Sequence, residues 1–264
     1  MKKTAFKTLV FLCMSFGFYS CMESSDDYKE ELYRGVAAAR WDVGKSANFL
    51  LSTDPFTAME LELVYMEGFK SSDQMIELMV AFLEKYTFKP DGITVLEKEI
   101  PAMNKGDYTT EDIAKIEEDY RERYNKGNTV SVFLLVVDGN FKQDEECSFT
   151  IGAAYRNTSL VLFGNRIAEN SGGFIKPSKA TLETTVALHE MGHLMGLVNI
   201  GSDMVVPHED EENENHCDNE DCLMYWAIET KSIFNYMHQS VPPLDNNCEL
   251  DLRANGGREI LSDS

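Results

Sequence analysis

The composition of this chain is that of a folded protein: 264 residues, 43% of them hydrophobic, are enough for one domain of good size. Its net charge of −21 at pH 7 would repel nucleic acid and anionic lipid. The charge therefore argues against a DNA-binding protein and against a protein that binds membranes through a basic surface, and we expect no nucleic-acid partner.

The N-terminus has the composition of a secretory signal peptide. Residues 1–20 contain three lysines and then an apolar run too short for a stable membrane anchor. Their removal, which takes away three lysines and no acidic residue, changes the net charge from −21 to −24. Cys21 follows directly and resembles the acylated cysteine of bacterial lipoproteins. This resemblance implies a protein anchored by lipid to the bacterial outer membrane, on its periplasmic or external side; the alternative is ordinary cleavage near Ser20.

The part of the chain after the signal divides into two segments. Residues 21–53 are polar and mixed, without a strong hydrophobic period, so we expect a lipid-anchored tether that packs loosely. The hydrophobic pattern sharpens after this segment. Residues 54–264 are therefore expected to form the single folded domain.

Within that domain, hydrophobic residues recur with the periods of strands and helices. Residues 58–69 alternate apolar and acidic side chains, which predicts a half-buried strand. Ser71 and Gln74 have the spacing of a capping box, and Thr110 is a candidate N-cap. The expected strands are 58–69, 92–101, a central strand at 129–139, and one or two more within 149–165, broken near Asn157; the expected helices are 71–86, 111–125 and 179–197.

The order of these elements predicts an α+β protein with an α/β-like upper part. A mixed, twisted sheet would come first in the chain, followed by the helix at 179–197. This helix is apolar on nearly every side, as a buried helix should be.

The buried helix carries a motif with metal-ligand spacing, within ALHEMGHLMGLVN at residues 187–199. His189 and His193 are one helical turn apart, so both rings leave the same face and can bind one tetrahedral Zn²⁺. Glu190 lies beside the pair, where it can act as general base for a zinc-bound water, whose pKa the metal lowers to about 7. The alternative is a pair of core histidines without metal, but the position of the motif on a buried helix after a sheet favours zinc.

The stretch HEMGHLMG resembles the H-E-x-x-H-x-x-G signature of the metzincin metalloproteases. In that family the glycine, here Gly196, turns the chain sharply out of the helix. Metzincins have a third histidine three residues after this glycine, and this chain has Asn199 there. The motif is therefore incomplete at its expected third ligand.

A second stretch, HCDNEDCLM at residues 216–224, resembles the archaemetzincins, a branch of the metzincins. Their third histidine is followed by two cysteines and the methionine of the Met-turn. The spacing is reproduced in full by His216, Cys217, Cys222 and Met224. The resemblance implies that an insertion has moved the third zinc ligand to His216, and that a small C-terminal subdomain follows the Met-turn.

Three further residues near these motifs have candidate roles. His208, inside the insertion, is the alternative third ligand, because the amide of Asn199 is a poor donor for zinc. By the family resemblance, Met224 would form the apolar floor beneath the metal. Tyr225 is a candidate stabiliser of the transition state, although the usual tyrosine of the family lies one residue further on.

The cysteines allow two interpretations. One leaves with the signal peptide and Cys21 is the lipid candidate, so four remain. Exported proteins fold where thiols oxidise, so we expect two disulfides, Cys217–Cys222 and Cys147–Cys248. The archaemetzincin resemblance implies instead a second, structural zinc held by a cysteine cluster, although this chain has only Cys248 where that family has a C-x-x-C.

Together these features predict a zinc-dependent metalloendopeptidase, in which Glu190 assists the attack of a zinc-bound water on a peptide bond. Residues 54–264 would then be the zinc metalloprotease domain, with one catalytic Zn²⁺, a protein or peptide substrate and a monomeric state. Two alternatives remain. One is a catalytically silent surface lipoprotein that binds peptides or glycans, and the other is a zinc amidase that acts on cell-wall peptides.

Overall fold

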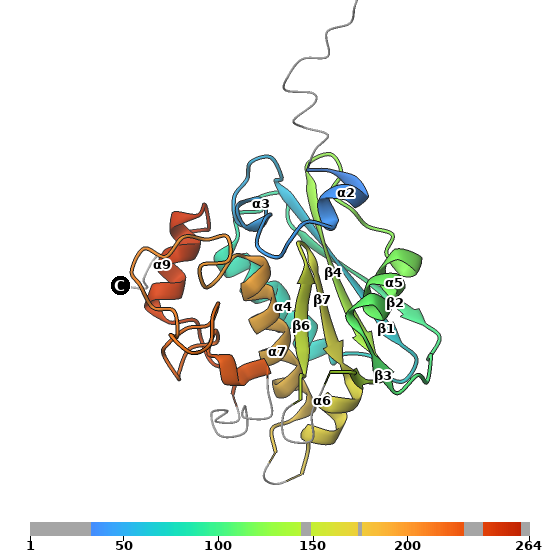
Figure 1. The fold of residues 1–264 in the computed structure, drawn as a ribbon. Coiled ribbons are helices and arrows are strands. Elements are labelled where there is room, and N and C mark those ends of the chain that lie inside the picture. The colour runs from blue at the N-terminus through green and yellow to red at the C-terminus, as the bar shows by residue number, and fades with distance from the viewer. Residues whose placement is uncertain (1–32, 144–148, 174–175, 230–239, 260–264) are drawn as a thin grey trace, which may run out of the picture.

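The structure is a computed structural model, and it describes residues 33–143, 149–173, 176–229 and 240–259. The centre is a five-stranded sheet in the order β2-β1-β4-β7-β6, in which β6 is antiparallel to β7 and the other neighbouring pairs are parallel (Figure 1). The elements in chain order are α2 (Gly35–Ala39), α3 (Ala47–Leu51), β1 (Ala58–Met66), α4 (Asp73–Tyr86), β2 (Ile93–Ile100), β3 (Asp107–Tyr108), α5 (Thr110–Tyr120), β4 (Thr129–Val137), β5 (Asn140–Phe141), β6 (Gly152–Arg156), β7 (Ser159–Phe163), α6 (Gly164–Asn170), α7 (Lys179–Leu194), η1 (Trp226–Glu229) and α9 (Asn246–Ala254).

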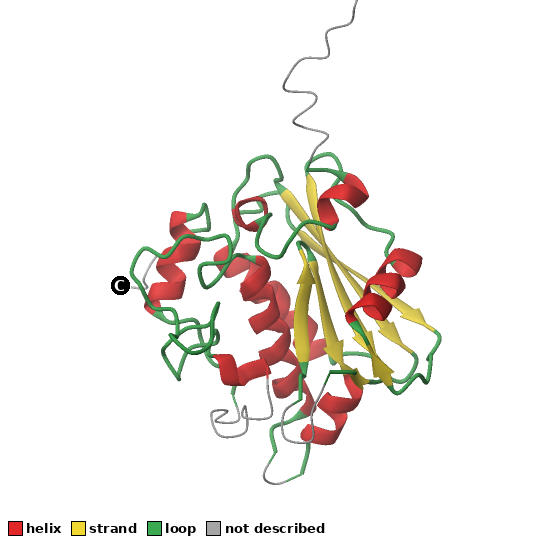
Figure 2. Ribbon diagram, viewed as in Figure 1, coloured by secondary structure: helices red, strands yellow, loops and turns green. Residues whose placement is uncertain are grey.

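Helices cover both faces of this sheet (Figure 2). The larger core lies on the face covered by α4 and α7, and includes Leu63, Met79 and Val186. The smaller core lies on the opposite face, where Ile113 and Ile116 of α5 pack. Helix α7 contacts β6 and β7, so the motif-bearing helix runs beside the edge strand of the sheet. Among the described residues, no helix is both long and apolar enough to cross a membrane.

The structure confirms the strands and helices expected from the sequence, but the helix expected to reach residue 125 ends at Tyr120 and the one expected to reach 197 ends at Leu194. Helix α4 has its N-cap at Ser72, one residue after Ser71. The helix expected to start after Thr110 has its N-cap at Thr109, which forms a capping box with Asp112. Strands β6 and β7 are separate, as the expected break near Asn157 required.

Strand β1 is more buried than its alternating pattern predicted. It pairs with β2 on one side and with β4 on the other, and Glu62 is only 3% exposed. The Glu62 carboxylate accepts the backbone N–H groups of Glu122 and Arg123, each at 2.9 Å. These hydrogen bonds replace the water that the sequence pattern suggested, because a buried carboxylate needs compensating donors.

The N-terminal part of the described chain is packed against the domain, which corrects the predicted boundary of the tether. Ala38 and Leu50 are fully buried. Asn157 donates from Nδ2 to the carbonyl oxygen of Ala38 at 2.9 Å. Residues 33–53 therefore belong to the folded domain, and the predicted tether shortens to 21–32, which lies outside the described residues.

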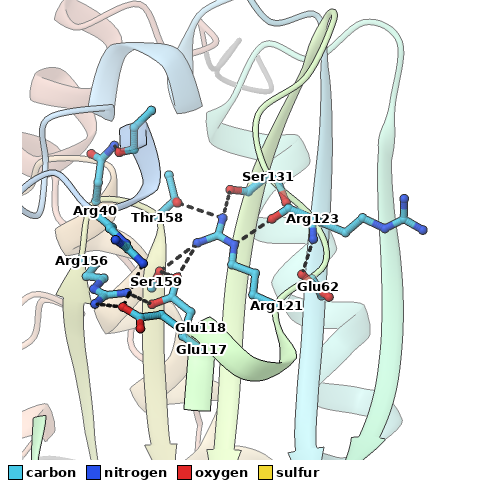
Figure 3. Close-up of polar contacts among 12 residues, drawn as sticks. Arg40, Glu62, Glu117, Glu118, Arg121, Arg123, Ser131, Arg156, Thr158 and Ser159 are labelled. Atoms are coloured by element: carbon cyan, nitrogen blue, oxygen red, sulfur yellow. Dashed lines mark hydrogen bonds and ion pairs between the residues drawn. The ribbon is translucent and has the colours of Figure 1, made fainter. Parts of the chain in front are cut away.

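A buried arginine joins the end of α5 to β4 and β7 (Figure 3). Arg121 donates from Nη1 to Glu117 at 2.7 Å and to Ser159 at 3.0 Å, and from Nη2 to the carbonyl oxygen of Ser131 at 3.0 Å. The side chains of Arg121 and Glu117 are 0% and 2% exposed, and Arg156 at the end of β6 adds a second cation 3.1 Å from Glu117. Because an unpaired buried charge is strongly destabilising, this network fixes the end of the edge strand.

Candidate metal centre

Helix α7 presents the motif residues and then ends abruptly. Its N-cap is Ser178, whose hydroxyl accepts the N–H of Thr181 at 3.0 Å, and its last residue is Leu194. Gly196 has a φ of +86°, and a Cβ at this position would lie 2.4 Å from the backbone nitrogen of Ser202. Only glycine fits here, so the chain leaves the helix where the motif predicted.

Three histidines converge near the end of this helix, and we call them the histidine group: His189, His193 and His216. Their ligand atoms lie within 4.8 Å of one another, and the Nε2 atoms of His189 and His193 are 3.1 Å apart. The His216 ring stacks on the His189 ring with centroids 5.3 Å apart. The structure therefore brings His216 to the pair on α7, as the displaced motif predicted.

Backbone carbonyls orient all three rings in the same way. Each Nδ1 lies opposite a carbonyl oxygen, at 2.7 Å for His189, 3.1 Å for His193 and 2.9 Å for His216. The acceptors are the carbonyl oxygens of Leu223, Leu197 and Glu214. Because a carbonyl can only accept, Nδ1 is the donor in each pair, and Nε2 is the nitrogen that a neutral ring would offer to a metal. Such hydrogen bonds are typical of histidines that bind metals.

The geometry of the histidine group fits zinc. Two nitrogen ligands about 2.0–2.1 Å from one tetrahedral ion lie ~3.3 Å apart, close to the 3.1 Å between His189 and His193. Three imidazoles that leave one position open are the donor set of a catalytic zinc site. The side chain of Asn199 donates from Nδ2 to Glu209 at 3.4 Å.

Glu190 lies beside this group and is held by the edge strand. Its carboxylate is buried, with 1% of the residue exposed, and Oε2 accepts the backbone N–H of Ala154 in β6 at 2.7 Å. No sequence signal pointed to Ala154, because the donor is a main-chain group.

Met224 packs against helix α7 at Gly192. It is fully buried, and a Cβ added at Gly192 would lie only 2.3 Å from its sulfur. Gly192 lies between His189 and His193 in the sequence, so the thioether fills the space left by the missing side chain. The role of Met224 as an apolar floor beneath the metal stays a prediction. The next residue, Tyr225, packs its ring on Trp226, and its catalytic role stays a prediction.

A second group of ligand-type side chains lies next to the first, and we call it the thiolate group: His208, Cys217, Cys222 and Cys248. The Sγ atoms of Cys222 and Cys248 are 3.7 Å apart. Nδ1 of His208 lies 3.4 Å from Cys217 Sγ and 4.0 Å from Cys248 Sγ. Tetrahedral zinc separates two thiolates by ~3.8 Å and a thiolate from a nitrogen by ~3.5 Å, so these distances suit a zinc site with three cysteines and one histidine.

This arrangement corrects two predictions. Cys217, Cys222 and Cys248 are free thiols, so the expected Cys217–Cys222 disulfide is wrong. The expected partner of Cys248, Cys147, lies outside the described residues. His208 was the alternative third ligand of the catalytic zinc, and the structure places it beside Cys217, Cys248 and Asp245 instead.

A buried carboxylate sets the orientation of His208. Nε2 of His208 donates to Asp251 Oδ2 at 2.8 Å, and both side chains are almost completely buried. Burial by itself lowers the pKa of His208, but the hydrogen bonds with Cys217 and Asp251 outweigh it and raise this pKa to about 9. With Nε2 bonded to a carboxylate, Nδ1 is the atom presented to the thiols, as in carboxylate–histidine–zinc arrangements.

The backbone favours a thiolate at Cys222. The neighbouring thiols of Cys217 and Cys248 lower the pKa of Cys222 most, and the N–H groups of Met224 and Asp245, each 3.4 Å from Sγ, lower it further. Asp245 also reaches Cys217 through Oδ2 at 3.5 Å, but its Oδ1 caps α9. The buried imidazole of His208 is therefore the better fourth donor, because nitrogen and sulfur are the usual donors of structural zinc sites.

Comparisons with known proteins identify the fold. No protein-family model matches the chain, and no curated protein matches it. Among solved structures, the chain is similar to an archaemetzincin from Methanopyrus kandleri, with a TM-score of 0.51 and 16% identity, covering 75% of this chain and 96% of that one. It also matches metalloproteinase-II from Bacteroides fragilis, with a TM-score of 0.42 and 17% identity, covering 77% of this chain and 54% of that one. The first similarity confirms the expected α+β class with an archaemetzincin-like fold.

Proposed function

We propose that this chain is a zinc-dependent metalloendopeptidase of metzincin type. The observation that carries the proposal is the histidine group: the ligand atoms of three imidazoles lie within 4.8 Å of one another, and the buried Glu190 directly follows His189 on the same helix. A merely structural histidine cluster has no need of a carboxylate held at its side. The archaemetzincin-like fold is consistent with this function.

In this proposal His189, His193 and His216 hold the metal. A bound Zn²⁺ supplies Lewis-acid chemistry, which acidifies water and polarises a carbonyl group. Glu190 accepts the proton of the attacking water and returns it to the leaving amine. The N–H of Ala154 keeps this carboxylate in place.

A peptide substrate also fits the position of the site. Strand β6 is the last strand of its sheet and lies against α7, and its Ala154 reaches Glu190. An extended peptide can add to such an edge by main-chain hydrogen bonds. A peptide bound there would bring its carbonyl groups close to the histidine group.

Two finer features belong to the same proposal. We assign a second zinc to the thiolate group, where His208 takes the place of a fourth cysteine and the ion has a structural role. We also propose that the protein is exported and anchored through a lipid on Cys21. Cys21 lies outside the described residues, and this assignment follows from the sequence next to the signal peptide.

The test compares the parent protein with Glu190→Gln, both loaded with zinc. Each is incubated with an unfolded protein and, separately, with purified peptidoglycan, with and without a chelator, and the products are identified by mass spectrometry. We expect chelator-sensitive cleavage of the protein substrate by the parent. Glu190→Gln should retain its zinc and cleave ~10²–10⁴-fold more slowly, the usual contribution of a general base. Cleavage of peptidoglycan alone would indicate an amidase, and no cleavage of either substrate by the zinc-loaded parent would indicate a binding protein.

A further inference from the structure

The loop that follows α7 contains a short hairpin, residues 208–218. Glu209 and Cys217 form an antiparallel bridge at its base. On either side of this bridge, the N–H of Asp210 donates to the carbonyl oxygen of His216 at 2.8 Å, and the N–H of residue 218 donates to the carbonyl oxygen of residue 208 at 2.9 Å. The two strands of the hairpin are therefore held in register at the positions that carry metal-ligand side chains.

This hairpin takes part in both groups. His208 on its first strand and Cys217 on its second strand belong to the thiolate group. His216, the residue directly before Cys217, belongs to the histidine group. Successive side chains of a strand point to opposite sides, so one strand presents one ligand to each group. The position of His216 is tied to that of Cys217 by a single peptide unit.

Apolar packing cannot hold the tip of this hairpin. Residues 209–216 contain no apolar side chain, and five of these eight residues are Asp or Glu. Like charges this close together repel each other and favour an open loop. At the tip, Asp210 accepts the N–H groups of Glu212 and Asn213 at 2.8 and 2.9 Å, which shapes the turn without fixing it to the domain.

The contacts that fix the hairpin to the domain are concentrated at its base. Cys217 donates its N–H to the carbonyl oxygen of Met224 at 2.8 Å, and His208 is bonded to the buried carboxylate of Asp251 on α9 at 2.8 Å. Beyond the base, the N–H of Val198 reaches the carbonyl oxygen of residue 215 only at 3.4 Å. Asn199 adds a second bond of 3.4 Å, from its Nδ2 to Glu209. Of these bonds to the hairpin, the shortest are those of His208 and Cys217.

We infer that His208 is a positioning residue for His216. By taking part in the thiolate group, His208 closes the base of the hairpin and sets the distance of His216 from the two histidines of α7. Metal in the thiolate group therefore fills first and strengthens metal binding by the histidine group. This inference rests on the proposed function. It adds that metal binding by the histidine group depends on metal binding by the thiolate group, and we call this dependence the link between the two sites.

The experiment titrates Co²⁺ into the metal-free, reduced, full-length protein. Cobalt bound by thiolates has a charge-transfer absorption that cobalt bound only by imidazoles lacks, so the two binding events can be followed separately. Hydrogen exchange of the Asp210 and Asp218 amides reports on closure of the hairpin. In the parent protein we expect the thiolate signal first, together with protection of both amides, and binding by the histidine group second.

Three variants make the test specific. His208→Ala should lose thiolate-group metal and bind cobalt in the histidine group about 10- to 100-fold more weakly, the usual effect of losing a residue that supports a ligand. His208→Cys should restore both, because Nδ1 is the ring nitrogen nearer the backbone and a thiol can take its place. Glu211→Ala, an exposed change in the same hairpin, should behave like the parent.

The outcomes distinguish failure of the link between the two sites from failure of the proposed function. If His208→Ala loses the thiolate signal but binds cobalt in the histidine group with the parent's affinity, the link is refuted and the function stands. If the parent binds no cobalt in the histidine group, the proposed function fails and the link fails with it. If His208→Ala does not fold, the link is tested by the order of cobalt binding in the parent and in His208→Cys. Binding by the histidine group before the thiolate signal appears would refute the link.

Discussion

Replacing Gly192 with alanine should disturb the metal site although it adds only one methyl group. The new Cβ would lie 2.3 Å from the sulfur of Met224 and 3.1 Å from its terminal methyl group. Met224 is fully buried, so it can move only by displacing its neighbours. Overpacking of this kind typically costs ~1–3 kcal/mol. Alanine in the interior of a helix contributes ~0.8–1.0 kcal/mol in the opposite direction.

The net expectation for Gly192→Ala is a free energy of unfolding lower by about 1 kcal/mol, together with weaker zinc binding by the histidine group. Denaturant unfolding of the metal-free protein gives the first quantity, and zinc titration gives the second. Met224→Ala provides the matched background, because truncation of Met224 leaves room for the new methyl group. In the Met224→Ala variant, Gly192→Ala should raise the free energy of unfolding by ~0.8–1.0 kcal/mol, the helix-propensity difference between glycine and alanine.

The result that would refute this reasoning is simple to recognise. If Gly192→Ala stabilises the parent as much as it stabilises the Met224→Ala background, and zinc affinity is unchanged, the thioether does not occupy the space beneath the two histidines.

Three further predictions concern other parts of the chain. Lys89→Met should lower the free energy of unfolding by ~1–3 kcal/mol in denaturant titrations, because the Lys89 ammonium donates to three backbone carbonyls within residues 49–56 and the substitution leaves them without this donor. The hydrogen bond from Lys105 is the main cause that lowers the pKa of Asp112 to about 2, so its stabilisation is present above pH ~4 and lost as the pH falls towards 2. Asp112→Asn should therefore cost about 1 kcal/mol at pH 7 and almost nothing at pH 2, and an equal loss at both would contradict the pairing. Cys21→Ala should move the protein from the membrane fraction to the soluble fraction, and unchanged partition would show that no lipid is attached there.

The sequence predicted those features that depend on local periodicity. The spacing of His189 and His193 fixes their common face, because the helix repeat decides it. The buried character of α7 and the strand-rich segments around Asn157 were likewise visible in the pattern of apolar residues. The convergence of His216 could be expected only from the resemblance to a known motif, since an insertion separates it from the helix.

The features that the sequence did not predict depend on contacts between distant segments. The thiolate group needs Cys248 and Asp251 of α9 to lie beside a loop 26 to 43 residues earlier, and cysteine spacing alone could not distinguish such a cluster from disulfides. The packing of residues 33–53 was missed because their attachment is made by Asn157, far along the chain. One feature of the sequence could have suggested that His208 binds the structural metal. The chain has few histidines, and this one lies shortly before the segment that contains Cys217 and Cys222.

The central claim is that the histidine group holds the zinc that is needed for hydrolysis. The most direct measurement adds zinc stepwise to the metal-free, reduced protein and records, at each step, the bound zinc and the rate of cleavage of an unfolded protein. We expect the parent to bind two equivalents, with cleavage appearing only as the second one binds. His216→Ala should keep the thiolate-group zinc, lose the other and show no cleavage. If His216→Ala binds both equivalents as tightly as the parent and cleaves at the parent's rate, the zinc and the chemistry are not at this site.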